Sequence, residues 1–543
     1  MIIISGPMQR YTISEYAQYP EAFWYLLYGE YSIGIFLAVW YRNVARFRHI
    51  GMLFAIVSQT LMISALSILG YFATDPYDGT VAIGYAKSIE LTGTLVVGDF
   101  YPAFHIIEYA VGQMTRLQLS TLALLTVPAL YLMYLLGVYV FVRAIGRGRE
   151  AAWLALVLAS PLVYTLILVP VPRTFVFCLI PLFLTAAYRL SKGKAGLVAI
   201  LSLILMLVIA HPLDGGPMLV IPLVLTTMLS LGVNLNLKRR ISSLRSNATH
   251  LVGVIMIICL VWLIWVLRFN GLSPYLQELV SGSSGAGLAF VTSTISKSHL
   301  PTTLVTGIIL KEFGGQFEYM TAGVVGLLYL FVSTKQRRRA VPLYAASLFL
   351  FYGVWILLTS TLPVELVFWR FIGYLMFASS VLLAFLASEV KRRSALILVL
   401  SLVLSSQAIG ASSLYSSPWT STVSITTTRA DVASVQWLSG KTSPLTVVRS
   451  VLIPASSLVS AVFGMTPSFG ANSTSAPNSQ LRYKLDGSIL YFPSYAPVYY
   501  PDKFPNYPAN WGYSPRDASK MISTAGICIV YSNPDISLFL LGC

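Results

Sequence analysis

Long apolar blocks, separated by short basic or polar segments, follow one another along most of the chain. A block of about 17 to 25 residues is what a helix needs to cross roughly 30 Å of hydrocarbon. We expect an all-α polytopic membrane protein with about twelve transmembrane helices, at residues 23–41, 51–73, 118–142, 151–169, 174–190, 195–211, 216–233, 251–268, 320–334, 340–360, 367–388 and 394–411.

Composition supports this class and excludes a soluble enzyme. Only 10% of the residues are charged, whereas soluble domains carry roughly 25%. The net charge of +16 comes from basic clusters between the apolar blocks, such as Arg42, Arg46 and Arg48. Basic loops of membrane proteins face the cytoplasm. The charge therefore indicates topology rather than nucleic-acid binding, and both termini are expected outside the cell membrane.

The hydrophilic segments divide the chain into three parts: an N-terminal segment 1–50 with one helix, a transmembrane module 51–411 with outer loops 74–117 and 269–319, and an extracytoplasmic domain 412–543. In the second loop, the stretch FVTSTISKSHLPTTLVTGIIL is expected to lie on the membrane or enter it partway.

The C-terminal part predicts a small α/β domain. A helix is expected in TTTRADVASVQWLSG, with Ala433, Val435, Trp437 and Leu438 as its apolar residues, and strands in LTVVRSVL and GICIVYS. Cys528 and Cys543 are candidates for a disulfide. The chain contains neither a nucleotide-binding glycine loop nor paired Cys-x-x-Cys ligands, so ATP-driven transport and a structural zinc are unsupported.

The first outer loop concentrates carboxylates. It holds five of the 20 acidic residues in the chain: Asp75, Asp78, Glu90, Asp99 and Glu108. A carboxylate just outside a membrane can accept a proton from a substrate hydroxyl or bind a divalent cation. The alternative is that these acids cap short helices, since Asp75 precedes a proline as residues before a helix start often do.

Several short motifs follow one another in a recognisable order. The first loop opens with DPYDG, continues through KSIELTG and closes with FYPAFH; the motifs VPVPRTF, AHPLDGG, FWRFIGYL and ADVASVQWL come later. This series resembles the GT-C superfamily of polyprenyl-phosphate-dependent glycosyltransferases, especially their archaeal and bacterial members. The resemblance covers most of the chain from about residue 51, and residues 1–50 lie outside it.

The resemblance implies transfer of a sugar from a polyprenyl-phosphate-linked donor to a glycan or protein acceptor on the outer membrane face. Asp75 matches the position of the general base, and inversion at the anomeric carbon would follow. Many relatives carry a histidine shortly after this Asp, whereas this chain has Asp78, a second carboxylate or metal ligand. A divalent metal is allowed but not required, because arginine and lysine can hold a lipid monophosphate alone.

Three further acidic or imidazole side chains are candidates for the acceptor side of the site or its wall: His105, Glu108 and His211. His105 and Glu108 share a face if their segment is helical. His105 could orient the acceptor or contact phosphate, and its alternative role is a structural hydrogen bond. His211 is expected first as a capping and pairing group together with Asp214, and second as a site wall.

Three outer cations are candidates for the donor phosphate: Arg370, Arg173 and Lys87. Arg370 is the best of them, because a charge inside the end of a span is costly unless it faces a polar cavity and guanidinium binds phosphate through two parallel hydrogen bonds. Its alternative is snorkelling towards the headgroups or pairing with Glu365. Lys87 could instead neutralise the acidic loop.

Two other functions remain open from the sequence. A non-catalytic subunit of the same fold could dock partner proteins through residues 1–50 and the C-terminal domain. A transporter is a third hypothesis, although the spans contain few acids beyond Glu30 and no evident two-fold hydropathy symmetry.

Overall fold

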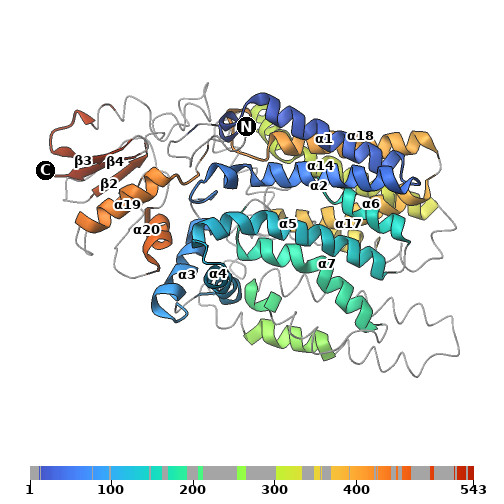
Figure 1. Ribbon diagram of the computed structural model, residues 1–543, viewed down its shortest axis with the longest axis horizontal. Helices are drawn as coiled ribbons and strands as arrows, with labels where there is room; N and C mark the ends of the chain where they lie inside the picture. The colour runs from blue at the N-terminus through green and yellow to red at the C-terminus, as the bar shows by residue number, and fades with distance from the viewer. Residues whose placement is uncertain are drawn as a thin grey trace.

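The computed structural model describes residues 14–75, 78–96, 99–145, 148–161, 169–191, 206–211, 253–264, 301–332, 348–354, 368–390, 392–420, 426–441, 448–450, 455–465, 489–493, 522–533 and 536–542, together with residues 12, 346, 356, 424 and 519. Figure 1 shows an elongated bundle of helices with a small sheet at one end. The bundle and its connections contain η1 (Glu15–Gln18), α1 (Glu21–Trp40), α2 (Ala45–Leu69), α3 (Asp78–Thr92), α4 (Pro102–Thr115), α5 (Leu119–Ala144), α6 (Arg149–Leu158), α7 (Pro172–Ser191), α14 (Thr302–Val332), α17 (Phe368–Glu389) and α18 (Arg393–Ser412).

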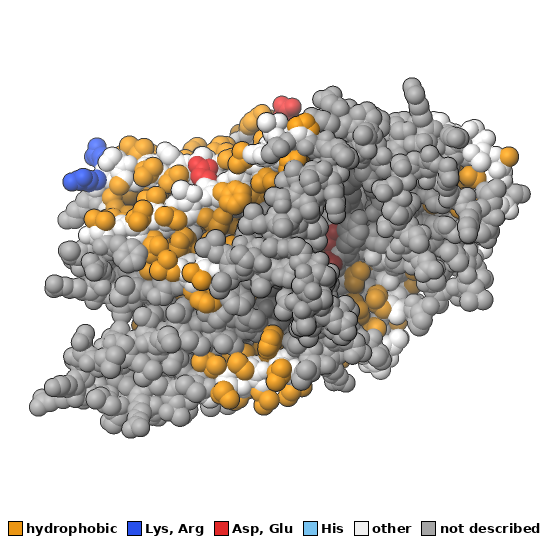
Figure 2. Space-filling view, turned by 180° about the vertical axis from the view of Figure 1, so that it is seen from behind, with side chains coloured by type: hydrophobic (Ala, Val, Ile, Leu, Met, Phe, Trp, Pro, Cys, Tyr) orange, Lys and Arg blue, Asp and Glu red, His pale blue; other side chains and the backbone are white. Residues whose placement is uncertain are grey.

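Five helices of the described chain are long and apolar enough to cross a membrane: α1, α2, α5, α18 and residues Ile372–Glu389 of α17. Hydrophobic side chains are exposed over the coloured part of the bundle surface in Figure 2, as expected for helices in contact with lipid. The membrane protein predicted from the sequence is confirmed, but the count of about twelve spans is not. The helix expected at 151–169 ends at Leu158 as α6, and the block at 216–233 lies outside the described residues.

Helix α14 begins earlier than the span predicted at 320–334. The structure has one continuous helix from Thr302 to Val332, so the last part of the predicted outer loop 269–319 is helical and the expected start at residue 320 is wrong. Lys311, Glu312 and Glu318 lower the local hydropathy and hide the helix from the pattern. Tertiary contacts accommodate two of them, because Glu318 accepts a hydrogen bond from Ser405 and the Lys311 ammonium donates to the Trp419 carbonyl at 3.0 Å.

The N-terminal helix α1 is packed into the bundle. Gly34 of α1 and Gly51 of α2 meet so closely that a Cβ atom on Gly34 would lie 2.7 Å from the backbone oxygen of Gly51. Tyr28 of α1 donates a hydrogen bond to the Leu404 carbonyl of α18 at 3.1 Å. The extra helix is therefore part of the folded unit.

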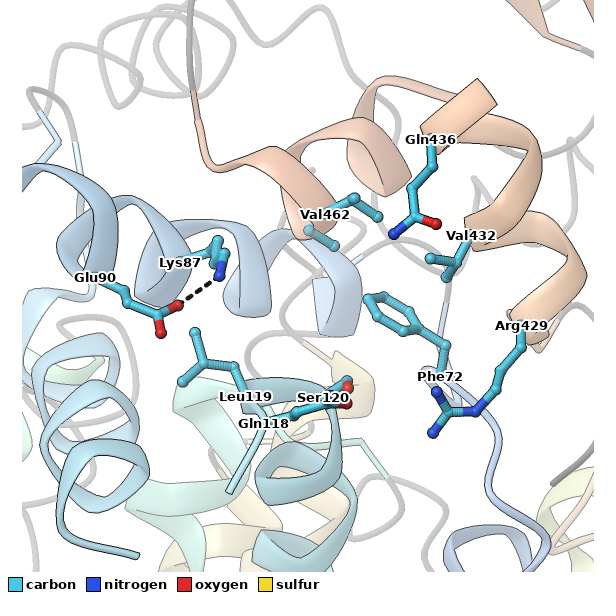
Figure 3. A pocket seen from close by; sticks show the side chains of 11 residues that line it. Phe72, Lys87, Glu90, Gln118, Leu119, Ser120, Arg429, Val432, Gln436 and Val462 are labelled. Atoms are coloured by element: carbon cyan, nitrogen blue, oxygen red, sulfur yellow. Dashed lines mark hydrogen bonds and ion pairs between the residues drawn. The ribbon is translucent and has the colours of Figure 1, made fainter. Parts of the chain in front are cut away.

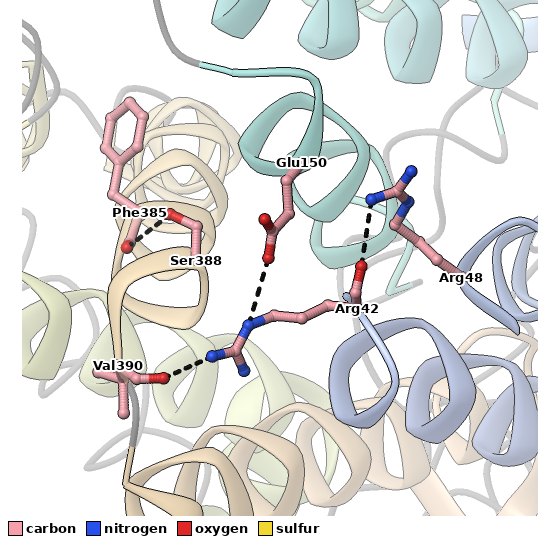
Figure 4. A network of polar contacts seen from close by, with 6 residues as sticks. All are labelled: Arg42, Arg48, Glu150, Phe385, Ser388 and Val390. Atoms are coloured by element: carbon pink, nitrogen blue, oxygen red, sulfur yellow. Dashed lines mark hydrogen bonds and ion pairs between the residues drawn. The ribbon is translucent and has the colours of Figure 1, made fainter. Parts of the chain in front are cut away.

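The end of the bundle away from the sheet carries a polar network that joins three elements (Figure 4). Arg42, in the turn between α1 and α2, lies 3.3 Å from the Glu150 carboxylate of α6 and donates to the Val390 carbonyl after α17 at 2.6 Å. Arg48 donates in turn to the Arg42 carbonyl at 3.1 Å. Arg42 and Arg48, which belong to the basic cluster after the first apolar block, thus also connect the ends of neighbouring helices.

The C-terminal domain is a four-stranded sheet with two helices packed on it. Its elements are η3 (Pro418–Thr420), α19 (Arg429–Lys441), β1 (Val448–Ser450), α20 (Ala455–Phe463), β2 (Ile489–Pro493), β3 (Ile527–Ser532) and β4 (Ile536–Leu541). The strand order is β1-β2-β4-β3, with β1 parallel to β2 and the other pairs antiparallel. The core consists of Val435, Leu438, Leu458, Val459, Ile489, Tyr491, Ile536 and Leu538.

Most of the sequence-based expectations for this domain hold. The helix and the two expected strands form, while β2 and β4 were not predicted. Ala433, one of the apolar residues of the expected helix, is exposed, because α19 turns Asp431 and Ser434 inward with Val435 and Leu438. Cys528 is disulfide-bonded and Cys178 and Cys259 are free; Cys543, the expected partner, lies outside the described residues.

The start of α19 is fixed by a reciprocal capping arrangement, a known feature of helix N-termini. The Thr428 hydroxyl accepts a hydrogen bond from the Asp431 N–H at 3.2 Å, and the Asp431 carboxylate accepts from the Thr428 N–H at 2.6 Å. Tyr491 of β2 donates to the same carboxylate at 3.1 Å. The first residue of α19, Arg429, is therefore held firmly against the sheet domain.

Candidate functional site

A backbone bridge joins the bundle to the C-terminal domain next to the first outer loop. Helix α2 ends at Gly70, whose φ of 72° lies in the left-handed region that glycine adopts without strain. The chain then pairs with the segment before α19: the Phe72 N–H donates to the Thr427 carbonyl at 2.9 Å, and the Thr427 N–H donates to the Ala73 carbonyl at 3.0 Å. Asp75 follows two residues after this bridge.

Asp75 is half-buried at the start of α3. Its carboxylate accepts a hydrogen bond from the Gly79 N–H at 2.9 Å, and its carbonyl accepts from the Thr80 N–H at 3.2 Å. A Cβ atom on Gly79 would lie 3.8 Å from both the Asp75 Oδ2 atom and the Val169 Cγ1 atom. The structure therefore places Asp75 beside the VPVPRTF turn, which begins at Val169.

The other acids at the start and end of α3 have different surroundings. Asp78 is exposed in the first turn of α3. Lys87 forms an ion pair with Glu90 at 2.7 Å, one turn further along the same helix. Lys87 is thus partly neutralised by the acidic loop, which is the alternative role that the sequence offers for it.

His105 is held by a buried hydrogen bond to an acid that the sequence analysis did not assign to the site. The His105 Nδ1 atom lies 2.8 Å from the Asp99 Oδ2 atom, and each side chain is 2% exposed. Asp99 also accepts a hydrogen bond from the Tyr101 N–H at 2.9 Å. The Tyr85 ring of α3 stacks on the imidazole, with ring centroids 4.8 Å apart. These contacts fix the orientation of His105.

His211 lies close to the start of α4, near His105. Tyr101, directly before α4, stacks on the buried His211 ring with centroids 4.9 Å apart and planes within 5°. Phe104 packs edge-on against Phe175 of α7 at 5.8 Å. Segments 99–115, 172–175 and 206–211 therefore lie together although they are far apart in the sequence.

Glu108 is a buried acid with an unusual environment. The residue is 4% exposed, and neither carboxylate oxygen has a hydrogen-bond partner within the described structure. Burial raises the pKa of Glu108 from its usual 4.5 to about 8. The side chain is therefore mainly protonated at pH 7 and can donate a hydrogen bond rather than accept a proton.

The arginines predicted to bind the donor phosphate, Arg173 and Arg370, are not equally well described by the structure. Arg173 is half-buried in the first turn of α7, where the helix N-terminus also favours anions. Arg370 is the third residue of α17, and its side chain lies outside the described residues, as does Asp214. Among the described residues, no group of three His, Cys, Asp or Glu side chains is arranged to hold a metal ion.

The sequence analysis counted Asp99 among the acids of the first loop without assigning it to the site, and it missed Tyr85, Tyr101 and Arg429. Asp99 lies six residues before His105, so their pairing depends on the turn before α4. Tyr85 and Tyr101 contact histidines across helices, which no local pattern reveals. Arg429 belongs to the helix expected in TTTRADVASVQWLSG. The structure places it in the lining of a cavity to which the first loop and α5 also contribute residues.

Comparison by sequence gives no relative: no family model matches the chain, and no curated protein matches it. Comparison by structure finds similar proteins. The oligosaccharyltransferase of Archaeoglobus fulgidus in its apo form matches with a TM-score of 0.51 and 11% identity, over 90% of this chain and 74% of that one. The same protein in complex with Zn and sulfate matches with a TM-score of 0.51 and 13% identity, over 90% and 73%.

A bacterial protein matches over nearly its whole length. ArnT from Cupriavidus metallidurans bound to undecaprenyl phosphate has a TM-score of 0.52 and 12% identity, over 90% of this chain and 98% of that one. Both neighbours are glycosyltransferases of the GT-C superfamily. The chain therefore shares the fold of the GT-C glycosyltransferases, which the motifs of its first outer loop and later spans predict.

Proposed function

We propose that this protein is a membrane glycosyltransferase that moves a sugar from a polyprenyl-phosphate donor to an acceptor hydroxyl. The observation that carries the proposal is the position of Asp75: it lies directly after span α2, at the bundle end that meets the C-terminal domain, in a fold shared with a protein solved with undecaprenyl phosphate. The basic clusters at the opposite end support an outer location of this end.

In the proposed reaction, Asp75 acts as general base. The acceptor oxygen attacks the anomeric carbon while its proton passes to the Asp75 carboxylate, and the bond from the anomeric carbon to the phosphate oxygen breaks. A single displacement inverts the anomeric configuration. The Gly79 N–H, which donates to the Asp75 Oδ2 atom at 2.9 Å, orients the carboxylate.

Other side chains are proposed to position the two substrates. The His105 Nδ1 atom is engaged by Asp99, which leaves Nε2 for the acceptor or the phosphate. Arg173, at the N-terminus of α7, is proposed to bind the donor phosphate together with Arg370. Lys87, predicted from the sequence for the same role, is instead paired with Glu90 at 2.7 Å. Glu108 and His211 are proposed to line the acceptor side.

A divalent metal fits the described residues poorly. Asp78 is exposed and one Asp75 oxygen accepts the Gly79 N–H, and no three-ligand group exists among the described side chains. No step of the proposal therefore passes through a metal.

The decisive experiment compares sugar transfer by purified wild type and Asp75→Asn, using radiolabelled polyprenyl-phosphate sugars and membrane acceptors. The Asn carboxamide oxygen can still accept the Gly79 N–H, so the fold should persist. We expect transfer to fall by about 10²- to 10⁴-fold, the usual effect of losing a general base, with donor binding retained. Glu21→Gln, which changes an exposed acid at the start of α1, is the matched control and should keep full activity. Equal transfer by wild type and Asp75→Asn would refute this role.

A further inference from the structure

A polar cavity lies where α3, the start of α5 and the C-terminal domain meet (Figure 3). Its volume is about 390 Å³, which is in the range of small-ligand sites. Helix α3 turns Tyr85 towards His105 and Lys87 towards this cavity. The bridge between Ala73 and Thr427 is antiparallel, so the chain leads from it to Asp75 in one direction and to Arg429 in the opposite direction. The cavity is therefore separate from the proposed catalytic group.

The N-terminus of α5 faces the cavity. Gln118, Leu119 and Ser120 all line it, and the Gln118 side chain makes no capping hydrogen bond. Within the described part of the chain, no acceptor binds the N–H groups of Leu119 and Ser120. Unpaired N–H groups and the helix dipole together favour an anion at such a position.

The Ser120 hydroxyl gives an independent indication of a ligand. Ser120 is 7% exposed and lines the cavity, and its hydroxyl has no hydrogen-bond partner among the residues that the structure describes. Its oxygen is not among the fully buried atoms that lack a partner in the described part of the chain, so it is open to the cavity. An acceptor atom in the cavity would satisfy this hydroxyl.

Arg429 supplies a cation from the opposite wall. The capping arrangement of Thr428 and Asp431 fixes its backbone, while its exposed guanidinium makes no hydrogen bond or ion pair with any described residue. Lys87 also lines the cavity, but Glu90 neutralises it at 2.7 Å. Figure 3 shows Arg429 and Gln436 on the C-terminal domain side, opposite Gln118 and Ser120. The lining therefore has an excess of positive charge and of hydrogen-bond donors.

We propose that this cavity binds an acidic sugar through its oxyanion, a phosphate or a carboxylate. The Arg429 guanidinium forms a bidentate contact with the oxyanion. The Ser120 hydroxyl and the first N–H groups of α5 donate to it, and the Gln118 and Gln436 amides bind the sugar hydroxyls. The site spans the bundle and the C-terminal domain, so an occupied cavity links the two.

Binding is tested with the full chain in nanodiscs of zwitterionic lipid, by calorimetric titration with glucose 6-phosphate, glucuronate and neutral glucose. We expect saturable binding of at least one of the two acidic sugars and none of glucose. The two acidic probes distinguish a phosphate from a carboxylate ligand. Saturable binding of neither acidic sugar, or equally strong binding of glucose, would overturn the proposal.

Variants assign the binding to this cavity. Arg429→Gln should weaken it by about tenfold to hundredfold, the effect of losing a charge-assisted contact, and Ser120→Ala should weaken it less. Arg392→Gln is the matched control, because Arg392 is an exposed arginine at the other end of the bundle. Binding unchanged in Arg429→Gln would contradict the assignment. Asp75→Asn should bind normally, which separates this result from any failure of the proposed transferase activity.

Discussion

Glu108 shows how burial sets the charge of a single residue. Its carboxyl has no hydrogen-bond donor among the described residues, so the cost of desolvating the charged form is not offset. The pKa consequently rises from 4.5 to about 8. In the unfolded chain the same group ionises at its ordinary pKa, and the folded state therefore binds one proton more between these two values.

The stability of the protein should consequently fall as pH rises from about 4.5 to about 8, by up to about 1.4 kcal/mol per pH unit from this residue. Glu108→Gln replaces the neutral acid by a side chain of similar shape that does not titrate, and it should remove this part of the slope. Thermal unfolding of the purified protein at pH 5, 6, 7 and 8 measures the effect. An identical pH dependence in wild type and variant would show that Glu108 does not hold its proton in the folded state.

At the scale of elements, the contact between α1 and α2 depends on the absence of side chains. A Cβ atom on Gly34 would lie 2.7 Å from both the Ala55 nitrogen and the Gly51 oxygen. These are backbone atoms of a neighbouring helix, which cannot move away individually. Small residues allow such close approach between helices in membranes.

Gly34→Val should therefore separate α1 from α2 and destabilise the protein by about 1–3 kcal/mol or more, the usual cost of overpacking. Gly29→Val is the matched control, because it introduces the same side chain in α1 at a position with no atom within 4 Å. Thermal unfolding in detergent compares the two variants. Equal midpoints would show that the close contact does not contribute to stability.

For the whole molecule, the question is how the C-terminal domain stays on the bundle. Besides the bridge between Ala73 and Thr427, α20 packs closely on α3 at Gly84, and Glu15 of η1 accepts hydrogen bonds from the Ser424 hydroxyl at 2.9 Å and the Ser416 N–H at 3.3 Å. The N-terminal segment, offered by the sequence as a docking element for partners, thus contacts its own chain. No specific contact favours the non-catalytic alternative.

Gly84→Val should loosen this junction, because its Cβ atom would lie 2.9 Å from the Ser460 carbonyl carbon of α20. Hydrogen–deuterium exchange should rise in α20 and in residues 426–441, while α5 and α18 stay protected. Gly440→Val, in α19 with no atom within 4 Å, should leave exchange at the junction unchanged. If Gly84→Val gave wild-type exchange in α20, the tight contact would not be what holds the domain.

The sequence by itself determined the features that arise from local patterns. Hydropathy over windows of a helix length identified α1, α5 and α18 closely, because crossing hydrocarbon requires a continuous apolar segment. It also identified α2, but the predicted start at residue 51 is later than the observed start at Ala45. The motif order indicated the fold that the structural neighbours share. Residue types also singled out Asp75, His105 and Glu108, since acids and histidines are conspicuous in an apolar chain.

Tertiary structure alone decided what depends on contacts between distant segments. It extended α14 back to Thr302 because its polar side chains find partners on other elements. It paired His105 with Asp99 and stacked Tyr101 on His211. It also placed Arg429 across a cavity from Ser120, residues that are more than three hundred positions apart. Periodicity reports which face of one element is apolar, but only packing determines which faces meet.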